Sequence, residues 1–174
     1  RSKDFIRSNQ VEVTRQVGVS TNNGLDSSKF YGLRVEDQEI SLNVPDVVKI
    51  HAIYESKDSN APSLDKLTFV SGLGLDTNTI IGEKFIGKSS RAIGQIVNRV
   101  SGTEIEYVYL NDNTFSKGET ITFYESNIET NLQGITNGNY VNRTGNYTLD
   151  KGHKKQYSDY SRIVRKRNSS PPTN

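Results

Sequence analysis

The sequence predicts an all-β protein: a small antiparallel β-barrel or sandwich with extended N- and C-terminal arms. Three observations lead to this prediction. Apolar and polar residues alternate in short runs along the middle of the chain, which is the period of a strand with one buried face. Gly, Asn, Ser and Thr separate these runs, as is typical of hairpin turns. No stretch between residues 30 and 125 sustains the 3.6-residue period of a helix.

The predicted body covers residues 29–133 and begins with a hairpin. Apolar residues alternate over 30–44 around a short polar turn at 36–38. A further alternating run over 47–54 follows Pro45, where a missing backbone N–H does least harm to a strand. We therefore expect antiparallel strands joined by short turns from the start of the body.

An internal repeat lies farther along the body. Asn-Thr-Ile-Ile-Gly-Glu at 78–83 recurs with one extra residue as Asn-Thr-Phe-Ser-Lys-Gly-Glu at 113–119, so the Gly-Glu pairs are 36 residues apart. In each copy we expect the Gly to supply a turn or bulge and the Glu to open a strand. The next alternate residue, Phe85 or Ile121, should then point inward. Two copies are too few for a solenoid, so the repeat favours a small barrel or sandwich of hairpins.

Both ends are predicted to be arms. Residues 1–28 contain alternating valines among polar residues, which indicates an extended segment able to add to a sheet edge. Residues 134–174 are predicted to be a Gly/Asn-rich loop followed by a basic C-terminal arm. Within this arm, 134–149 has the composition of a loop, and we expect one short helix over 150–167 because apolar and aromatic residues there can share a face.

The net charge of +2 conceals an uneven distribution. Residues 1–20 have four basic and two acidic residues, and residues 146–174 have seven and two. This leaves 11 basic and 16 acidic residues for 21–145. The chain is therefore an acidic body between two basic arms, and such charged ends are typical of segments that contact another surface.

Composition excludes several classes of protein. No run approaches 18 apolar residues, so we expect no membrane-spanning helix. The chain has no cysteine, which excludes disulfides, thiol nucleophiles and cysteine-ligated zinc. Neither histidine, His51 or His153, has a partner that the sequence places beside it. We therefore expect no catalytic residue, no metal, no cofactor and no enzyme activity.

Tyrosines interleaved in the basic arm are typical of nucleic-acid binding, but the acidic body argues against it.

Two sets of motifs resemble virion structural proteins of contractile-tailed phages. Gly-Lys-Ser-Ser-Arg-Ala-Ile-Gly-Gln-Ile-Val at 87–97, followed by Phe-Ser-Lys-Gly-Glu-Thr-Ile at 115–121, resembles a module recurrent in virion proteins of large tailed phages. Residues 149–166 and 31–50 are similar to long structural proteins of myoviruses that infect marine cyanobacteria. Together these resemblances cover about residues 30–166, which is most of the chain.

This resemblance implies a non-enzymatic building block of a virion, in the tail, baseplate or fibre. The related proteins are much longer, and a chain that starts at Arg1 and lacks Met is expected to be one internal domain of such a protein. Its partners would be other virion structural proteins, together with further copies of itself in a symmetric particle.

We expect the C-terminal arm to make the contacts with neighbouring subunits through strand addition or basic contacts. The candidate contact residues are Tyr157, Tyr160, Arg162, Arg165 and Lys166. The alternative is a carbohydrate or host-surface binding module of a tail fibre, with Tyr140 and Tyr147 as loop aromatics. A hydrolase would need paired carboxylates in a cleft, which the sequence does not place.

Overall fold

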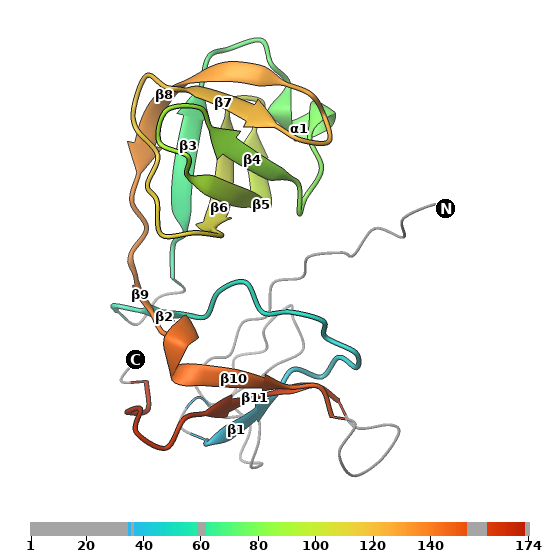
Figure 1. The fold of residues 1–174 in the computed structure, drawn as a ribbon, viewed down its shortest axis with the longest axis vertical. Coiled ribbons are helices and arrows are strands. Elements are labelled where there is room, and N and C mark those ends of the chain that lie inside the picture. Colours follow the sequence, from blue (N-terminus) through green and yellow to red (C-terminus); the bar gives the residue numbers. More distant parts are fainter. Residues whose placement is uncertain (1–34, 36, 59–61, 153–159, 173–174) are drawn as a thin grey trace. The chain divides into compact units, whose positions relative to one another are not determined.

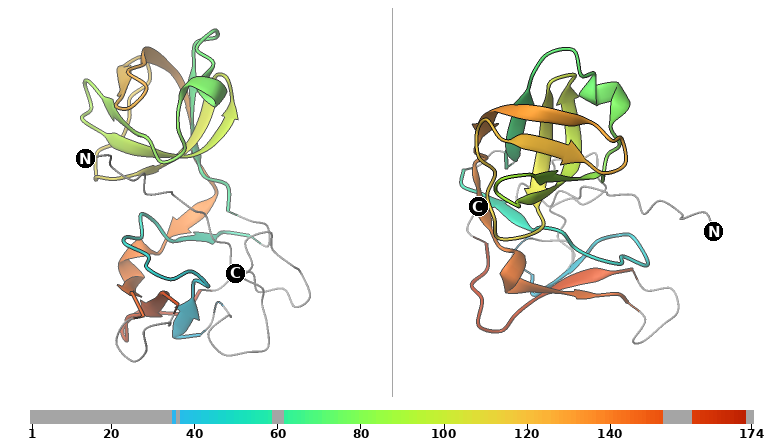
Figure 2. Two further views of the ribbon diagram at one scale, coloured as in Figure 1. Left: turned by 90° about the vertical axis from the view of Figure 1, so that its right-hand side faces the viewer. Right: turned by 45° about the horizontal axis from the view of Figure 1, so that its top comes forward.

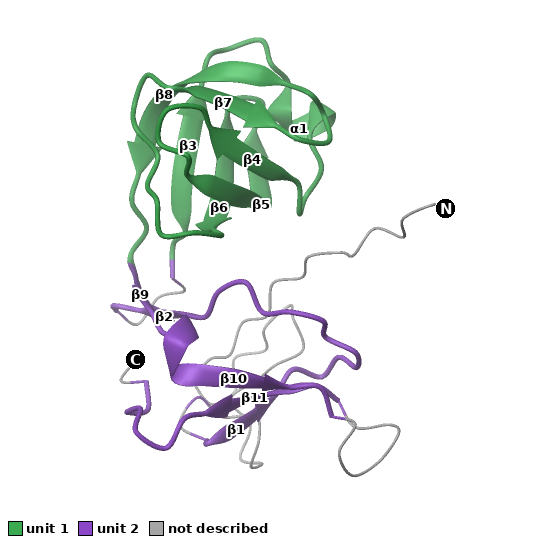
Figure 3. Cartoon of the chain, viewed as in Figure 1, with its two compact units in different colours: residues 1–9, 63–139 green, residues 10–62, 140–174 purple. Residues whose placement is uncertain are grey.

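The computed structural model describes residues 35, 37–58, 62–152 and 160–172 (Figure 1). The chain forms two compact units (Figure 3), and it passes from one to the other and back. The described part of the first unit is Ser63–Asn139. The second combines described residues up to Pro62 with those from Tyr140 onward. Strands dominate both units, so the all-β prediction is confirmed.

The first unit contains a closed six-stranded antiparallel barrel, which Figures 1 and 2 show from several sides. The order around the barrel is β3-β6-β5-β4-β7-β8, and β8 pairs back onto β3. Its strands are β3 (Asp65–Phe69), β4 (Lys84–Gly87), β5 (Ile93–Ser101), β6 (Glu104–Tyr109), β7 (Thr120–Phe123) and β8 (Glu129–Thr136). A four-residue helix, α1 (Leu75–Asn78), lies between β3 and β4 in the chain. Of the two predicted architectures, the barrel is therefore the one that forms.

Aromatic side chains fill much of the barrel interior. The ring of Phe85 lies 5.3 Å from those of Phe115 and Phe123 and 5.7 Å from that of Tyr107, measured between centroids. Phe85 faces Gly94 in the β4–β5 register, and a Cβ at Gly94 would overlap the Phe85 ring. Burial of these rings supplies the main favourable free energy of the barrel.

The sequence repeat is also a structural repeat. Strands β3-β4-β5 form one half of the barrel and β6-β7-β8 the other. The strands of the two halves pair with each other at β3–β6, β5–β6, β4–β7 and β3–β8. In the β4–β7 pair, Ile86 lies opposite Thr122, 36 residues further along the chain. The turns of the β4–β5 and β7–β8 hairpins share an unusual feature: Arg91 and Asn127, again 36 residues apart, both have positive φ angles, of 59° and 55°. An approximate twofold axis through the Ile86–Thr122 pair therefore relates the halves.

The second unit contains two small sheets. Three strands have the order β1-β11-β10: β1 (Glu39–Ser41), β11 (Arg162–Arg165) and β10 (Tyr147–Asp150). Strands β2 (Tyr54–Ser56) and β9 (Tyr140–Asn142) form an antiparallel ribbon, and a 3₁₀ turn, η1 (Thr144–Asn146), leads into β10. The buried hydrophobic cluster of this unit consists of Ile40, Tyr147 and Ile163, so it is much smaller than the barrel core.

The structure divides the chain differently from the predicted body and arms. The barrel occupies 63–139, whereas the body was expected over 29–133 and the C-terminal region over 134–174. Part of the expected body thus joins the C-terminal segment in the second unit. The expected N-terminal arm, 1–28, lies outside the described residues.

Three local predictions of secondary structure are wrong. The predicted helix over 150–167 is replaced over 162–165 by strand β11, because β-branched Ile163 and Val164 suit a strand paired on both sides. The predicted loop over 134–149 contains β9 and parts of β8 and β10. In the run predicted as a strand over 47–54, only Tyr54 is in one.

Candidate functional site: assembly surfaces

The C-terminal segment that was predicted as a contact arm forms the central strand of a sheet. Strand β11 pairs with β1 on one side and β10 on the other. Arg162 lies between two carboxylates: its Nη1 atom is 3.3 Å from Glu39 Oε2, and its Nε atom is 3.4 Å from Asp150 Oδ2. The charge of Arg162 is therefore balanced within its own unit, by one residue from each neighbouring strand.

The next basic residues also contact their own unit. The backbone N–H of Arg165 donates to the carbonyl of Gln38 at 2.8 Å, and its guanidinium lies 3.5 Å from the carbonyl of Asp37. The ammonium of Lys166 donates to the carbonyl of Gly145 at 2.7 Å. These contacts fasten the C-terminal strand to distant parts of the chain.

The remaining predicted contact residues are two tyrosines. Tyr160 is 54% exposed and Tyr157 lies outside the described residues. Of the predicted set, Tyr160 is thus the large side chain that the structure leaves accessible, and Lys166 is the exposed basic one. A role of these residues in subunit contacts stays a prediction.

The two candidate aromatics of the alternative function are in strands rather than in a loop. Tyr140 begins β9 and stacks on Tyr54 of β2, with ring centroids 3.9 Å apart and an angle of 20° between the planes. Tyr147 begins β10 and is 8% exposed. Burial raises the pKa of the Tyr147 phenol above 10.0, and the charge of Arg165 and a hydrogen bond with it act in the opposite direction. Only Tyr140 therefore has a surface that a ligand could reach.

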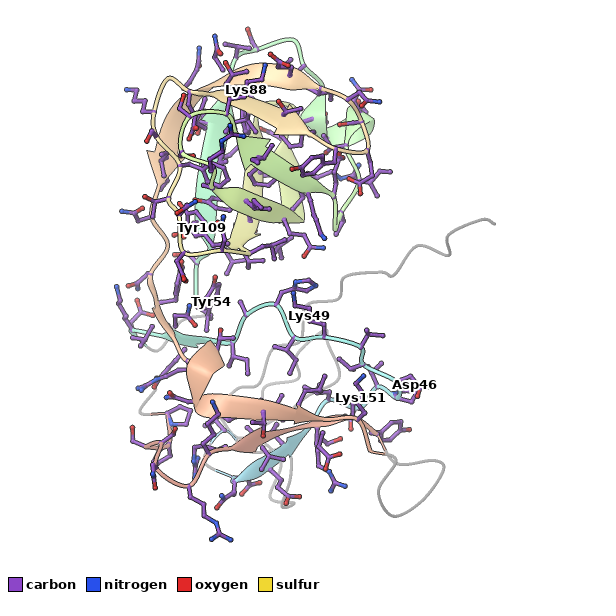
Figure 4. The ribbon with its side chains drawn as sticks, viewed as in Figure 1. Asp46, Lys49, Tyr54, Lys88, Tyr109 and Lys151 are labelled. Atoms are coloured by element: carbon purple, nitrogen blue, oxygen red, sulfur yellow. The ribbon has the colours of Figure 1, made fainter. Side chains whose placement is uncertain are left out.

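A buried ion pair joins residues near the β2–β9 ribbon. The Nε atom of Arg143 lies 2.6 Å from Glu55 Oε2, and the Glu55 side chain is only 4% exposed. The backbone N–H of Arg143 also donates to the carbonyl of Ile53. Figure 4 labels Tyr54, the neighbour of Glu55 in the ribbon. These charges serve the fold of the second unit.

The barrel contains a buried carboxylate at each Gly-Glu pair, and the first is Glu83. This residue is 2% exposed. Its Oε1 atom accepts hydrogen bonds from the backbone N–H groups of Glu125 and Ser126, at 2.9 and 2.7 Å, and from the Ser126 hydroxyl at 2.9 Å. Its Oε2 atom accepts from the N–H of Ile80 at 3.1 Å. One carboxylate thus joins the turn before β4 to the β7–β8 turn.

The second carboxylate, Glu119, makes the equivalent contacts with the β4–β5 turn of the first half. It is 7% exposed and accepts from the N–H groups of Ser89 and Ser90, at 3.3 and 3.0 Å, and from the Ser90 hydroxyl at 2.9 Å. It also accepts from the N–H of Ser116 at 2.6 Å. Each Glu therefore holds the hairpin turn of the other half. We call these two sets of contacts the reciprocal clasp.

The sequence indicated part of this arrangement. Gly82 and Gly118 do supply turns, with φ angles of 91° and 87°, and Phe85 and Ile121 are fully buried as expected. The role of the carboxylates was missed. A signal was present, because a Ser stands in each hairpin turn at the same 36-residue spacing as the Glu residues.

Oxygen-rich turns elsewhere in the barrel also serve the fold. The Asn111 side chain accepts from the N–H of Ile93 at 3.0 Å and donates to the carbonyl of Arg91 at 2.9 Å. Among the described residues, no three acidic or histidine side chains form a group that could hold a metal ion. His51 is partly buried, and His153 lies outside the described residues. No helix in the described part of the chain is long and apolar enough to cross a membrane.

No family model, no curated protein and no solved structure matches this chain.

Proposed function

We propose that this chain is a non-enzymatic structural module of a phage virion, which assembles with other tail, baseplate or fibre subunits. The observation that carries the proposal is the place of the resembling motifs in the fold. The motifs at 87–97 and 115–121 contain Ser90 and Glu119, which form one side of the reciprocal clasp. The residues that resemble virion proteins of tailed phages therefore include residues that hold a hairpin turn of the barrel.

The two units suit different tasks in such a module. A closed barrel has no free sheet edge and is a self-contained building block. In the second unit, within the described residues, β1 and β10 are the outer strands of one sheet, and β2 and β9 have one neighbour each. Outer strands offer backbone N–H and C=O groups to an added strand. We therefore assign assembly contacts to the sheet edges of the second unit and to the neighbouring Tyr160 and Lys166.

Particle purification tests the proposed function. Phage particles whose genome carries this reading frame would be banded by density and analysed by quantitative mass spectrometry. We expect peptides of this chain at a fixed copy number per particle, set by the symmetry of the tail. Detection of the chain only in the soluble fraction, with none in purified particles, would contradict the proposal.

A variant pair tests the proposed contact residues. The double variant Tyr160→Ala, Lys166→Ala should reduce incorporation into particles, because an exposed tyrosine is typical of interface anchors and an exposed lysine can face an acidic group of the partner. Lys49→Ala, at an exposed lysine of the same unit that lies outside its strands (Figure 4), is the matched control and should assemble normally. Equal incorporation of both variants would remove these residues from the interface.

One observation favours the alternative, a carbohydrate or host-surface binding module. The partly exposed Tyr54–Tyr140 stack is an aromatic platform of the kind on which sugar rings can pack. A glycan array with the purified chain tests it. Binding that disappears in Tyr140→Ala, with circular dichroism unchanged, would favour this function over the structural one.

A further inference from the structure

The approximate twofold symmetry of the barrel allows positions in its two halves to be compared. Glu83 and Glu119 make the same pattern of bonds, so the backbones around them are in the same arrangement. Around these carboxylates the two halves make the same backbone contacts, so a difference there between exposed side chains at equivalent positions is not required by these contacts. Such differences point to function.

At three pairs of equivalent positions, one half has an exposed apolar or aromatic residue where the other half has an exposed polar one. Ile80, Ile81 and Tyr124 are 50, 41 and 50% exposed. The residues 36 positions away are the exposed, polar Ser116, Lys117 and Lys88. Lys88, labelled in Figure 4, pairs with Glu129 at 2.6 Å, and the equivalent of Glu129 is Ile93. One end of the barrel is thus polar and charged where the other is apolar.

The apolar side chains belong to adjacent segments. One oxygen of the Glu83 carboxylate binds the N–H of Ile80, and the other binds the N–H of Glu125, which follows Tyr124. The N–H of Tyr124 also donates to the carbonyl of Lys84 at 3.0 Å. We call the surface formed by Ile80, Ile81 and Tyr124 the apolar end.

The charges beside the apolar end indicate which kind of surface is complementary to it. Lys84 and Glu125 are both exposed there, one basic and one acidic, and no ion pair within the described residues joins them. Their equivalents in the other half, Thr120 and Ser89, are uncharged. A surface with one charge of each sign beside an apolar centre is complementary to itself across a twofold axis, because each lysine then faces a glutamate.

We propose that the apolar end of the barrel pairs with the apolar end of a second copy of this chain. The pairing goes beyond the proposed function and does not require that the chain be part of a virion. Three half-exposed side chains offer far less than the roughly 800 Å² per partner that a stable interface buries. The pairing is therefore weak in solution and becomes effective when other contacts bring copies together, as in a particle.

Analytical ultracentrifugation of the purified chain tests the proposal, over a range from about 10 µM to about 1 mM that covers weak affinities. We expect reversible dimer formation toward the upper end of this range. The double variant Ile81→Lys, Tyr124→Lys should weaken it at least about 10-fold, since it removes two buried anchors. These substitutions introduce the residues already present at the equivalent positions, so the fold should accept them, which circular dichroism and thermal unfolding would verify.

Charge reversal tests whether the two copies face each other as proposed. Lys84→Glu alone should weaken the dimer, because two pairs of like charges would then meet. Lys84→Glu combined with Glu125→Lys should restore it, because opposite charges face each other again. Lys57→Glu, at an exposed lysine of the other unit, is the control and should leave dimerisation unchanged.

Two results would overturn the proposal. A chain that stays monomeric up to about 1 mM, the highest concentration of the series, does not pair through the apolar end. A dimer that Ile81→Lys, Tyr124→Lys leaves intact must use another surface.

Discussion

The barrel and the second unit are stabilised in different ways. The barrel has a continuous aromatic core of rings such as Phe85 and Phe123, and its turns are held by two buried carboxylates. The second unit has a hydrophobic cluster of three buried residues and depends on ion pairs, such as those of Arg143 and Arg162, between distant segments. A repeated, locally connected region can thus close on its own core, whereas a region built from separate segments needs specific polar contacts to hold its ends together.

The largest expected effect is in the barrel core. Phe85→Ala should lower the free energy of unfolding of the barrel by about 3–5 kcal/mol, because it leaves a cavity among three other rings. Urea unfolding, with amide hydrogen exchange to report on each unit, measures it. Ile163→Ala in the smaller core should cost less, about 2–3 kcal/mol. A larger loss from Ile163→Ala would show that the smaller core contributes more to stability than the barrel core does.

Substitution of the carboxylates of the reciprocal clasp should have the second-largest effect on the free energy of unfolding. Glu83→Gln and Glu119→Gln each turn an amide NH₂ toward backbone N–H donors, so at least one buried N–H loses its acceptor. We expect each variant to lower the free energy of unfolding by about 2–3 kcal/mol, the cost of such orphaned groups. Thermal unfolding compares them directly. Because the halves are equivalent, the two losses should agree within about 1 kcal/mol, and a loss in only one variant would show that the clasp is not reciprocal.

A smaller effect should appear in the second unit at high pH. The pKa of Tyr147 is raised by burial, so its phenol keeps a proton in the folded chain at a pH where the unfolded chain has lost it. The unfolded state then binds fewer protons, and stability falls as the pH rises above 10.0, by at most about 1.4 kcal/mol per pH unit.

Denaturation curves between neutral pH and pH 11 measure this loss. In Tyr147→Phe the decline above 10.0 should be less steep, because the group that titrates is gone. Tyr124→Phe, at an exposed tyrosine of the barrel, is the control. An identical pH dependence in Tyr147→Phe and the parent would show that this phenol is not responsible.

The smallest effect should come from the surface of the barrel. Lys88 and Glu129 form an ion pair, but both side chains are more than half exposed. Lys88→Ala should therefore change the free energy of unfolding by no more than about 0.5 kcal/mol. A loss of unfolding free energy above about 1 kcal/mol, more than an exposed ion pair usually contributes, would show that this ion pair stabilises the fold.

The sequence predicted the barrel better than the second unit for a physical reason. Alternation and the Gly-Glu repeat are local signals, and most barrel strands pair with a neighbour in the chain or in the repeat. In the second unit, Arg162 meets Glu39 across 123 residues, and no local pattern specifies such a pairing. The segment around Ile163 has a period that also fits a helix, so only its distant partners, β1 and β10, decide that it is a strand.

The candidate contact surfaces could likewise be predicted only in part from the sequence. Exposed tyrosines and basic residues near the C-terminus could be identified from the sequence, but the contacts of Arg162 and Arg165 within the unit could not, since they depend on residues of another sheet strand. The difference between the two ends of the barrel was likewise hidden, because it emerges only once Ile80 and Ser116 are known to be equivalent.

The most direct test of this account is amide hydrogen exchange at the two hairpin turns, followed by NMR. The reciprocal clasp predicts protected N–H groups at Ser90 and Ser126 in the parent chain. In Glu119→Gln, exchange should accelerate at Ser90 and not at Ser126, and in Glu83→Gln the opposite should occur. Rapid exchange at both turns in the parent, or loss of protection at the same turn in both variants, would contradict a barrel whose hairpin turns are held by two equivalent carboxylates.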